Sequence, residues 1–131
     1  MDRVIKVNFP DGQRIEADVQ GKVIKSDRPV DMGGEGTEPT PFALFLTSIA
    51  TCAGMYALGF CQSRDLSTEG MGLTLVSKKN EQADLKNRII IKLKLPDGFP
   101  EKYKRPILRT MDQCSVKQFI LNPPEFFMET E

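Results

Sequence analysis

Residues 42–63 carry no charged side chain, and no other feature constrains the fold of this chain as strongly. Thr40 and Pro41 precede this stretch, and they are typical of a helix N-cap and a first helical residue. As a helix the stretch would be about 33 Å long, which is sufficient to cross a bilayer. Its polar residues and glycines, without a flanking basic cluster, favour instead the central helix of a globular core. A membrane span remains the alternative interpretation.

Alternating hydrophobic residues predict strands before this helix. We expect three short strands there, over residues 3–9, 15–19 and 22–25. A turn over residues 10–12 separates the first two strands, because its Pro-Asp-Gly sequence is a strong turn signal. Residues 26–39 are rich in glycine and proline and predict a long loop, and loops of this length in small domains are often functional.

Two more strands and two shorter helices are expected after the central helix. The strands occupy residues 71–79 and 88–95. A second helix opens at Pro100 and is interrupted or restarted at Pro106. A short helical piece over residues 116–121 and an edge strand over residues 125–130 complete the chain. This order predicts an α+β fold with antiparallel sheets around a buried central helix, in a single domain over residues 1–131.

The composition excludes several kinds of chemistry. The chain has no histidine, so it has no Ser-His-Asp or Cys-His catalytic group and no histidine ligand for a metal or haem. Its three cysteines form no CxxC pair, and we expect neither a metal site nor a cofactor. The 18 basic and 18 acidic side chains balance, which argues against nucleic acid and anionic membranes as partners. The N-terminus lacks the layout of a signal peptide, which predicts a cytoplasmic protein with free thiols.

The three cysteines differ in their surroundings. Cys52 lies in the middle of the charge-free helix, where a small core residue and a reactive thiol are both open interpretations. Cys61 is nine residues further along, on the opposite side of the same helix, and is interpreted as a core residue. Cys114 precedes a short helical stretch, and a thiol at a helix N-terminus is expected to have a lowered pKa.

Two segments of the chain resemble the OsmC/Ohr family of proteins. The first is GGEGTEPTPFALFLTSIATC, which ends at Cys52, and the second is TMDQCSVKQFI, which contains Cys114. The order of strands and helices around them is also similar, so the resemblance covers nearly the whole chain. It implies an OsmC-like fold in an intertwined homodimer, with buried central helices and active sites shared between subunits. That assembly gives the charge-free helix an explanation without a membrane.

The resemblance also implies a chemistry. Cys52 would be the peroxidatic cysteine, which attacks an organic hydroperoxide, and Cys114 the resolving cysteine, which condenses with the resulting sulfenic acid. An external dithiol would then reduce the disulfide by exchange. We expect apolar side chains of the central helix to contact the substrate: Phe42, Phe45, Ile49 and Tyr56. The function implied is oxidative stress defence. The alternative is a non-enzymatic dimer that binds an apolar small molecule or senses thiol oxidation.

A buried thiolate needs a cation, because burial alone raises the pKa of a thiol. The organic-hydroperoxide branch of the family uses an arginine from the N-terminal strands, held by a glutamate early in the central helix. Arg14 is the best candidate for this arginine, and Arg28 is the second. This chain has Phe42 and Ala43 at the places where the glutamate would fall, and the nearest acidic residues, Glu35 and Glu38, lie in the loop before the helix.

Overall fold

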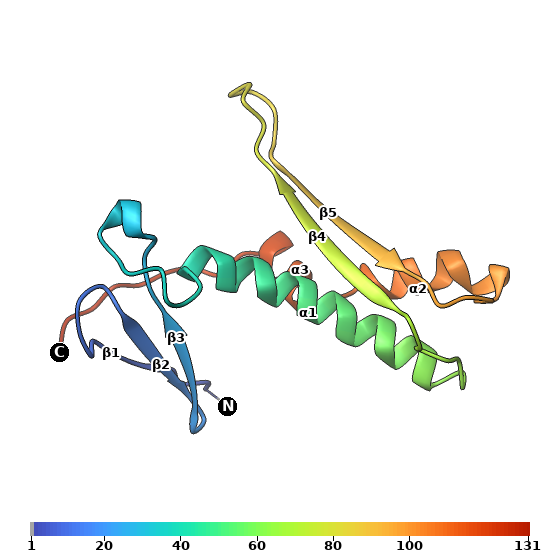
Figure 1. Cartoon of the computed structure of the whole chain (residues 1–131), viewed down its shortest axis with the longest axis horizontal. Helices are drawn as coiled ribbons and strands as arrows, with labels where there is room; N and C mark the ends of the chain where they lie inside the picture. The colour runs from blue at the N-terminus through green and yellow to red at the C-terminus, as the bar shows by residue number, and fades with distance from the viewer. Residues whose placement is uncertain (1) are drawn as a thin grey trace. The chain divides into compact units, whose positions relative to one another are not determined.

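The computed structural model describes residues 2–131 and divides the chain into two compact units, Met1–Leu46 and Thr47–Glu131. A single continuous helix, α1 (Pro41–Gln62), begins in the first unit and ends in the second (Figure 1). The predicted helix is therefore confirmed almost residue for residue. Thr40 is its N-cap, since the Thr40 hydroxyl accepts a hydrogen bond from the Ala43 N–H at 3.2 Å. The expectation of a single domain stays a prediction.

The first unit contains a three-stranded antiparallel sheet in the order β1-β2-β3. Its strands are β1 (Lys6–Asn8), β2 (Ile15–Val19) and β3 (Lys22–Ser26). The two-residue turn Gln20-Gly21 joins β2 to β3, and both of its residues have positive φ, at 54° and 84°. This backbone matches the twist of a tight hairpin. All three predicted strands are present, although β1 is shorter than its alternating pattern.

The second unit contains an antiparallel hairpin of two long strands, β4 (Gly72–Lys78) and β5 (Arg88–Lys94) (Figure 1). A 3₁₀ turn (Glu101–Tyr103) and the helices α2 (Lys104–Met111) and α3 (Ser115–Leu121) follow them. Pro106 lies in the first turn of α2, where the missing N–H leaves no helical hydrogen bond unmade. The helix begins at Lys104 and runs through this proline, so Pro106 neither interrupts nor restarts it.

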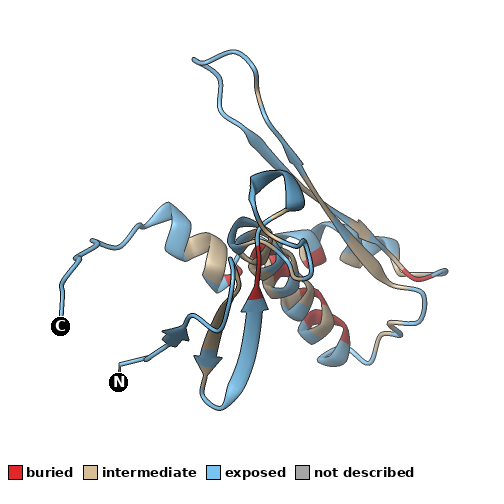
Figure 2. Ribbon diagram, turned by 60° about the vertical axis from the view of Figure 1, so that its left-hand side comes forward, coloured by how far each residue is buried: buried red, intermediate tan, exposed pale blue. Residues whose placement is uncertain are grey.

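A stripe of buried side chains along α1 forms the core of the second unit. These residues recur at three- and four-residue spacing and are Ile49, Ala53, Ala57, Phe60 and Cys61. Four of them, Ala53, Ala57, Phe60 and Cys61, form a buried cluster with Ile107 and Met111 of α2. Figure 2 shows buried residues, in red, along the central helix. Half-buried residues of the hairpin, including Ile91 and Leu93, cover the same core.

The predicted edge strand over residues 125–130 is wrong, because the structure has no strand after α3. Phe126 and Phe127 are 80% and 79% exposed, so this segment has no neighbouring strand to pair with in the described chain. Alternation of side chains predicts a strand only where a sheet edge is available to supply the hydrogen bonds.

Candidate functional site

Cys52 lies on the part of α1 that belongs to the second unit, and its thiol meets the beginning of α3. Its Sγ is 3.6 Å from Oγ of Ser115, the first residue of that helix. Cys52 is half-buried, whereas Cys114 is 1% exposed, and both are free thiols. Each of the two thiols influences the pKa of the other, so the fold brings together the pair that the sequence singled out.

The pKa of Cys52 is lowered from its usual value, although burial acts in the opposite direction. Burial is the largest single influence and raises the pKa, because it disfavours the charged thiolate. Hydrogen bonds from the Val116 N–H, the Ser115 hydroxyl, the Cys114 thiol and the Ser115 N–H together outweigh burial. The first backbone N–H groups of a helix have no partner within the helix and stabilise negative charge there. The start of α3 therefore helps to stabilise a thiolate at Cys52, which was expected to need a cation.

Cys114 shows the reverse behaviour, and the expectation that its pKa is lowered is wrong. The residue is the N-cap of α3, and its Sγ accepts a hydrogen bond from the Lys117 N–H at 3.3 Å. Burial nevertheless raises the pKa of Cys114, and the neighbouring Cys52 raises it further. The pKa of one thiol of the pair is thus lowered, and the pKa of the other is raised. This is the arrangement that an attacking thiolate and a resolving thiol need.

Cys61 is fully buried in the core of the second unit, as the sequence predicted for its position. Burial raises the pKa of this thiol, and the positive charge of Arg64 offsets only part of that effect. A neutral thiol packed among apolar side chains behaves as a small hydrophobic residue. Cys61 is thus fully buried and has a raised pKa, whereas Cys52 is half-buried and has a lowered pKa.

A cavity of about 410 Å³ opens beside Cys114 in the second unit. Apolar side chains dominate its lining, which consists of Ile49, Ala53, Ile89, Ile91, Leu108, Met111, Asp112, Cys114, Lys117 and Ile120. Lys117 and Asp112 form an ion pair, so the cavity presents no unpaired charge from these two residues. The volume and lining suit a small apolar molecule.

The structure separates the four predicted substrate contacts. Ile49 is 5% exposed and lines the cavity beside Cys114. Tyr56 is half-buried and lines a different, open hollow of the second unit, together with Phe60 and Arg64. Phe42 and Phe45 belong to the first unit, where their ring centroids are 5.8 Å apart and both rings are exposed. Among the four, Ile49 is thus the residue that lines the cavity beside Cys114.

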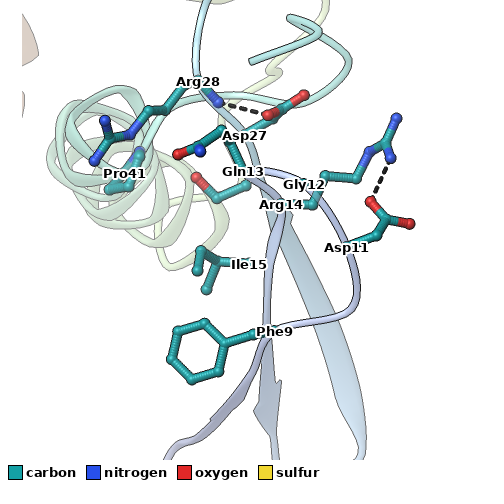
Figure 3. Close-up of a pocket in the computed structure, with 10 residues that line it drawn as sticks. Phe9, Asp11, Gly12, Gln13, Arg14, Ile15, Asp27, Arg28 and Pro41 are labelled. Atoms are coloured by element: carbon teal, nitrogen blue, oxygen red, sulfur yellow. Dashed lines mark hydrogen bonds and ion pairs between the residues drawn. The ribbon is translucent and has the colours of Figure 1, made fainter. Parts of the chain in front are cut away.

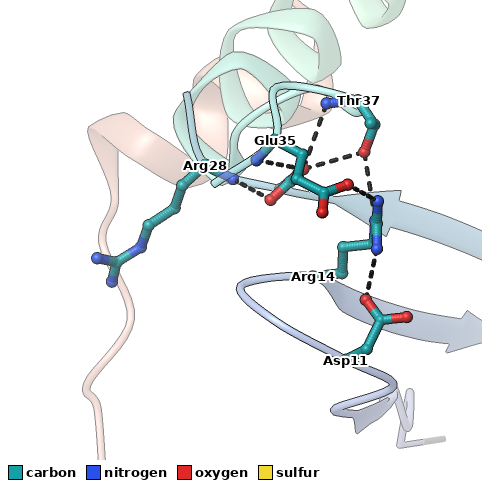
Figure 4. A network of polar contacts seen from close by, with 6 residues as sticks. Asp11, Arg14, Arg28, Glu35 and Thr37 are labelled. Atoms are coloured by element: carbon teal, nitrogen blue, oxygen red, sulfur yellow. Dashed lines mark hydrogen bonds and ion pairs between the residues drawn. The ribbon is translucent and has the colours of Figure 1, made fainter. Parts of the chain in front are cut away.

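Arg14, the predicted cation, is held within the first unit by a network of acceptors (Figure 4). Its guanidinium forms ion pairs with Asp11, at 2.5 Å, and with Glu35. Its Nε also donates to the Thr37 hydroxyl at 3.4 Å. The hydrogen bond and charge of Asp11, followed by the charge of Glu35, raise the pKa of Arg14. Glu35, in the loop before α1, therefore supplies an acidic partner that the sequence lacks at Phe42.

Asp27 organises the loop that carries Glu35 and Thr37. Its carboxylate is 2% exposed and accepts hydrogen bonds from the N–H of Arg28 at 2.7 Å, of Thr37 at 3.2 Å and of Glu35 at 3.3 Å, and from the Thr37 hydroxyl at 2.9 Å. Burial alone would raise the pKa of Asp27, but these hydrogen bonds together lower it. The loop also packs closely, since a Cβ at Gly34 would collide with the Arg28 carbonyl.

A pocket of about 450 Å³ in the first unit lies against this network (Figure 3). Arg14, Asp11 and Asp27 line one part of it, and Phe9 and Ile15 line another. Arg28 also borders the pocket, but its guanidinium has no ion-pair partner among residues 2–131. Of the two candidate arginines, Arg14 is thus the one whose side chain is fixed by acidic partners.

Loss of the Asp27 carboxylate should destabilise the protein, and the size of this effect should depend on pH. The folded pKa of Asp27 lies below its unfolded value of about 4. Its ionised form therefore stabilises the fold above that unfolded pKa, and this contribution is lost as the pH falls through the folded pKa. We expect Asp27→Asn to lower the melting temperature at pH 7, with a difference from the wild type that shrinks on acidification below about pH 4.

Differential scanning calorimetry at several pH values measures this difference. Asp31→Asn is the matched control, because Asp31 is an exposed acid in the same loop. An Asp27→Asn protein as stable as the wild type at pH 7, or an equal loss in Asp31→Asn, would contradict the role given to the Asp27 carboxylate.

Sequence reasoning missed several of these residues. Ser115 and Val116 stand next to Cys114, but nothing in their local pattern predicts contact with a thiol on α1. Asp27 opens the glycine-rich loop, and a short acidic side chain before such a loop is a signal for a turn that bonds its own backbone. No group of three or more His, Cys, Asp or Glu side chains within residues 2–131 is arranged to hold a metal ion.

Residues 34–129 match the family model described as OsmC-like protein. This chain belongs to the OsmC family. The matched range contains both Cys52 and Cys114 and the helices α1, α2 and α3, and it confirms the resemblance seen in the sequence. None of the curated proteins compared with the chain is similar to it in sequence.

Solved structures of the family share this fold at low sequence identity. An osmotic stress induced and detoxification response protein from Psychrobacter arcticus has a TM-score of 0.72 and 20% identity, over 87% of this chain and 85% of its own. An organic hydroperoxide resistance protein from Legionella pneumophila has a TM-score of 0.61 and 15% identity, over 92% and 89%. A Vibrio cholerae organic hydroperoxide resistance protein, with captopril bound in one active site, has a TM-score of 0.59 and 16% identity, over 89% and 83%. The α+β, OsmC-like fold is therefore confirmed.

The family also bears on the apolar helix. Within residues 2–131, α1 is the one helix long and apolar enough to cross a membrane by length and composition. Central helices of soluble proteins have the same property. Membership of the OsmC family supports a soluble protein in which α1 is the central helix. The cytoplasmic location stays a prediction.

Proposed function

We propose that this OsmC-family protein reduces organic hydroperoxides through the Cys52 and Cys114 pair. The observation that carries the proposal is the contrast between the two thiols at the start of α3. Hydrogen bonds lower the pKa of Cys52, while burial raises the pKa of Cys114 beside it. Hydroperoxide resistance is also the role named for the Legionella and Vibrio relatives.

The proposed reaction has three steps. The Cys52 thiolate attacks the outer oxygen of the hydroperoxide, the O–O bond breaks, and the departing alkoxide takes a proton to leave as the alcohol. Cys52 becomes a sulfenic acid, oxidised by two electrons. The Cys114 sulfur then displaces the sulfenic oxygen, which forms a disulfide and releases water. An external dithiol reduces this disulfide by two exchange steps and becomes a disulfide itself.

The cavity beside Cys114 supports an apolar substrate. Its lining is dominated by aliphatic side chains such as Ile49, Ile89 and Ile91. Burial of an alkyl or aryl group there would contribute free energy in proportion to the apolar area removed from water. Hydrogen peroxide has no such group, so we propose that organic hydroperoxides are favoured over it. The same cavity favours the second candidate function, in which the protein binds an apolar small molecule without turning it over.

The homodimer is likewise a proposal. Large hydrophobic side chains are exposed in each unit taken by itself, among them Phe9 and Val7 in the first and Phe119 and Leu121 in the second. Both sheets also end in strands whose outer edges have no partner strand among residues 2–131. Exposed apolar surface and open edges of this kind are typical of chains that associate. Size-exclusion chromatography with light scattering should give the mass of two chains.

Peroxide consumption tests the proposed function directly. The reduced protein is mixed with cumene hydroperoxide and an excess of dihydrolipoamide, and the loss of peroxide is followed over many turnovers. Hydrogen peroxide in place of cumene hydroperoxide should be consumed more slowly. A protein that consumes no hydroperoxide, but still binds cumyl alcohol in a calorimetric titration, would favour the non-enzymatic function instead.

Arg14 is proposed as the cation that assists Cys52 during turnover. A guanidinium fixed by two carboxylates is pre-oriented, and electrostatic stabilisation of the charge that develops in the transition state requires such preorganisation. We expect Arg14→Ala to lower kcat/KM for cumene hydroperoxide by about tenfold or more. Arg28→Ala is the matched control and should retain most of the activity. Equal activity in Arg14→Ala and the wild type, or a larger loss in Arg28→Ala, would contradict this assignment.

A further inference from the structure

The Ser115 hydroxyl is a neighbour of Cys52 with a chemical property that the other contacts lack. It lies 3.6 Å from Cys52 Sγ, and either atom can be the donor in this contact. The backbone N–H groups of Ser115 and Val116 also reach the sulfur, but an N–H can only donate. A hydroxyl rotates about its C–O bond and can donate or accept as its partner requires.

Ser115 also differs from Cys114, the other side chain hydrogen-bonded to Cys52. In the proposed reaction Cys114 is consumed, because its sulfur bonds to Cys52 and its proton leaves with the released water. The Ser115 hydroxyl takes part in neither event, so it remains available throughout. Its place at the first position of α3 fixes the hydroxyl in front of Cys52.

We propose that Ser115 is a catalytic residue, whose hydroxyl donates a hydrogen bond to the Cys52 thiolate before attack and accepts one from the Cys52 sulfenic acid afterwards. This inference rests on the proposed function for its second half. In the first state the Ser115 hydrogen points at the negatively charged sulfur. After oxygen transfer the sulfur is neutral and carries a hydroxyl, and the Ser115 hydroxyl turns its lone pair towards that group. No proton or electron is lost by Ser115 in either state.

The charges around Cys52 are few, so a single hydrogen bond to its sulfur can change its reactivity. Helix α1 contains no charged side chain. On the facing helix, Lys117 is paired with Asp112. The titratable group that influences the pKa of Cys52 is the thiol of Cys114. Hydrogen bonds to a charged group contribute more than those between neutral groups. Removal of the hydroxyl should therefore change the reactivity of Cys52 measurably.

Alkylation of Cys52 tests the first half of the proposal without any peroxide. The rate of carbamidomethylation of Cys52 by iodoacetamide is measured against pH in the full-length protein, with peptide mass spectrometry to separate Cys52 from the other thiols. We expect Ser115→Ala to move the midpoint to higher pH and to slow alkylation below the midpoint by about three- to tenfold. Ser115→Thr keeps the hydroxyl and should restore the wild-type midpoint.

Two features make the comparison decisive. Alanine is a strong helix former and fits the first position of α3, so Ser115→Ala is expected to fold. Ser77→Ala removes an exposed hydroxyl from β4, in another part of the same unit, and should leave the profile unchanged. A Ser115→Ala midpoint equal to the wild-type value would overturn the proposal.

The second half of the proposal, in which Ser115 accepts a hydrogen bond, is tested on the oxidised protein. One equivalent of cumene hydroperoxide is added, and the Cys52 sulfenic acid is trapped with dimedone at successive times. We expect Ser115→Ala to lose kcat/KM for cumene hydroperoxide by a factor similar to its loss in alkylation at the same pH, and to show a changed lifetime of the sulfenic acid. A wild-type lifetime in Ser115→Ala would overturn the acceptor role. A wild type that forms neither a sulfenic acid nor a disulfide would overturn the proposed function, while the alkylation profile still decides the donor role.

Discussion

Cys52→Ser should abolish hydroperoxide turnover, with kcat/KM for cumene hydroperoxide lower by on the order of 1,000-fold or more. The serine hydroxyl stays protonated at neutral pH, because its pKa is far higher than that of a thiol. Its oxygen also cannot take the place of sulfur as the atom that is oxidised. The substitution is small, and the half-buried position on α1 tolerates it, so the fold should be kept.

Cys61→Ala is the matched control for this experiment, because it removes the other thiol of the same helix. The Cys61 side chain is fully buried, and its loss should lower the free energy of unfolding by about 1 kcal/mol through the cavity left behind. Turnover should remain close to that of the wild type. Turnover in Cys52→Ser at the wild-type rate, or its loss in a folded Cys61→Ala protein, would show that the wrong thiol has been assigned.

Cys114→Ser should stop the reaction after one round of oxidation. Serine is among the preferred N-cap residues, so its hydroxyl can replace Cys114 Sγ as the acceptor for the Lys117 N–H and preserve α3. Cys52 would still be oxidised to the sulfenic acid, but no neighbouring thiol could convert it to a disulfide. With excess hydroperoxide the sulfur should then proceed to the irreversible sulfinic acid.

Intact-protein mass spectrometry follows this oxidation. One equivalent of cumene hydroperoxide should add a single oxygen atom to Cys114→Ser and form an intramolecular disulfide in the wild type. Steady-state turnover with dihydrolipoamide should fall by about tenfold or more in the variant, because the dithiol must reduce the sulfenic acid directly. Wild-type turnover in Cys114→Ser, or a disulfide between Cys52 and Cys61 instead, would remove Cys114 from the mechanism.

The two thiols also predict how activity depends on pH. Cys52 reacts as the thiolate, so the rate should rise with pH through the lowered pKa of Cys52. Cys114 must lose its proton as it attacks, and burial keeps it protonated to higher pH. The separation of the two pKa values follows from the positions of the two thiols, since Cys52 lies in front of the first N–H groups of α3 and Cys114 is the buried N-cap of that helix. The two thiols interact, so each measured midpoint belongs to the pair.

Whether a feature of the site could be predicted from the sequence depends on how far along the chain the contacting residues lie. The pairing of Cys52 and Cys114 could be predicted through the family resemblance, since both sit in its two segments. The lowered pKa of Cys52 could not, because it depends on Ser115 and Val116, which follow the other cysteine. Similarly, the sequence indicated Arg14, but the pairing of Arg14 with Glu35 depends on how the intervening loop folds around Asp27.

The sequence of the charge-free stretch was sufficient to predict α1. The signals are local properties of the chain: the cap at Thr40, the proline at the first position and the lack of charge. Alternation likewise predicted β4 and β5, whose two faces meet different surroundings. The edge strand over residues 125–130 failed on the same kind of signal, since a strand needs a partner that the local sequence does not supply. The tertiary structure alone decided that the start of α3 faces Cys52. A hydrogen bond between residues so distant in the chain depends on the packing of whole helices, and no local pattern encodes that packing.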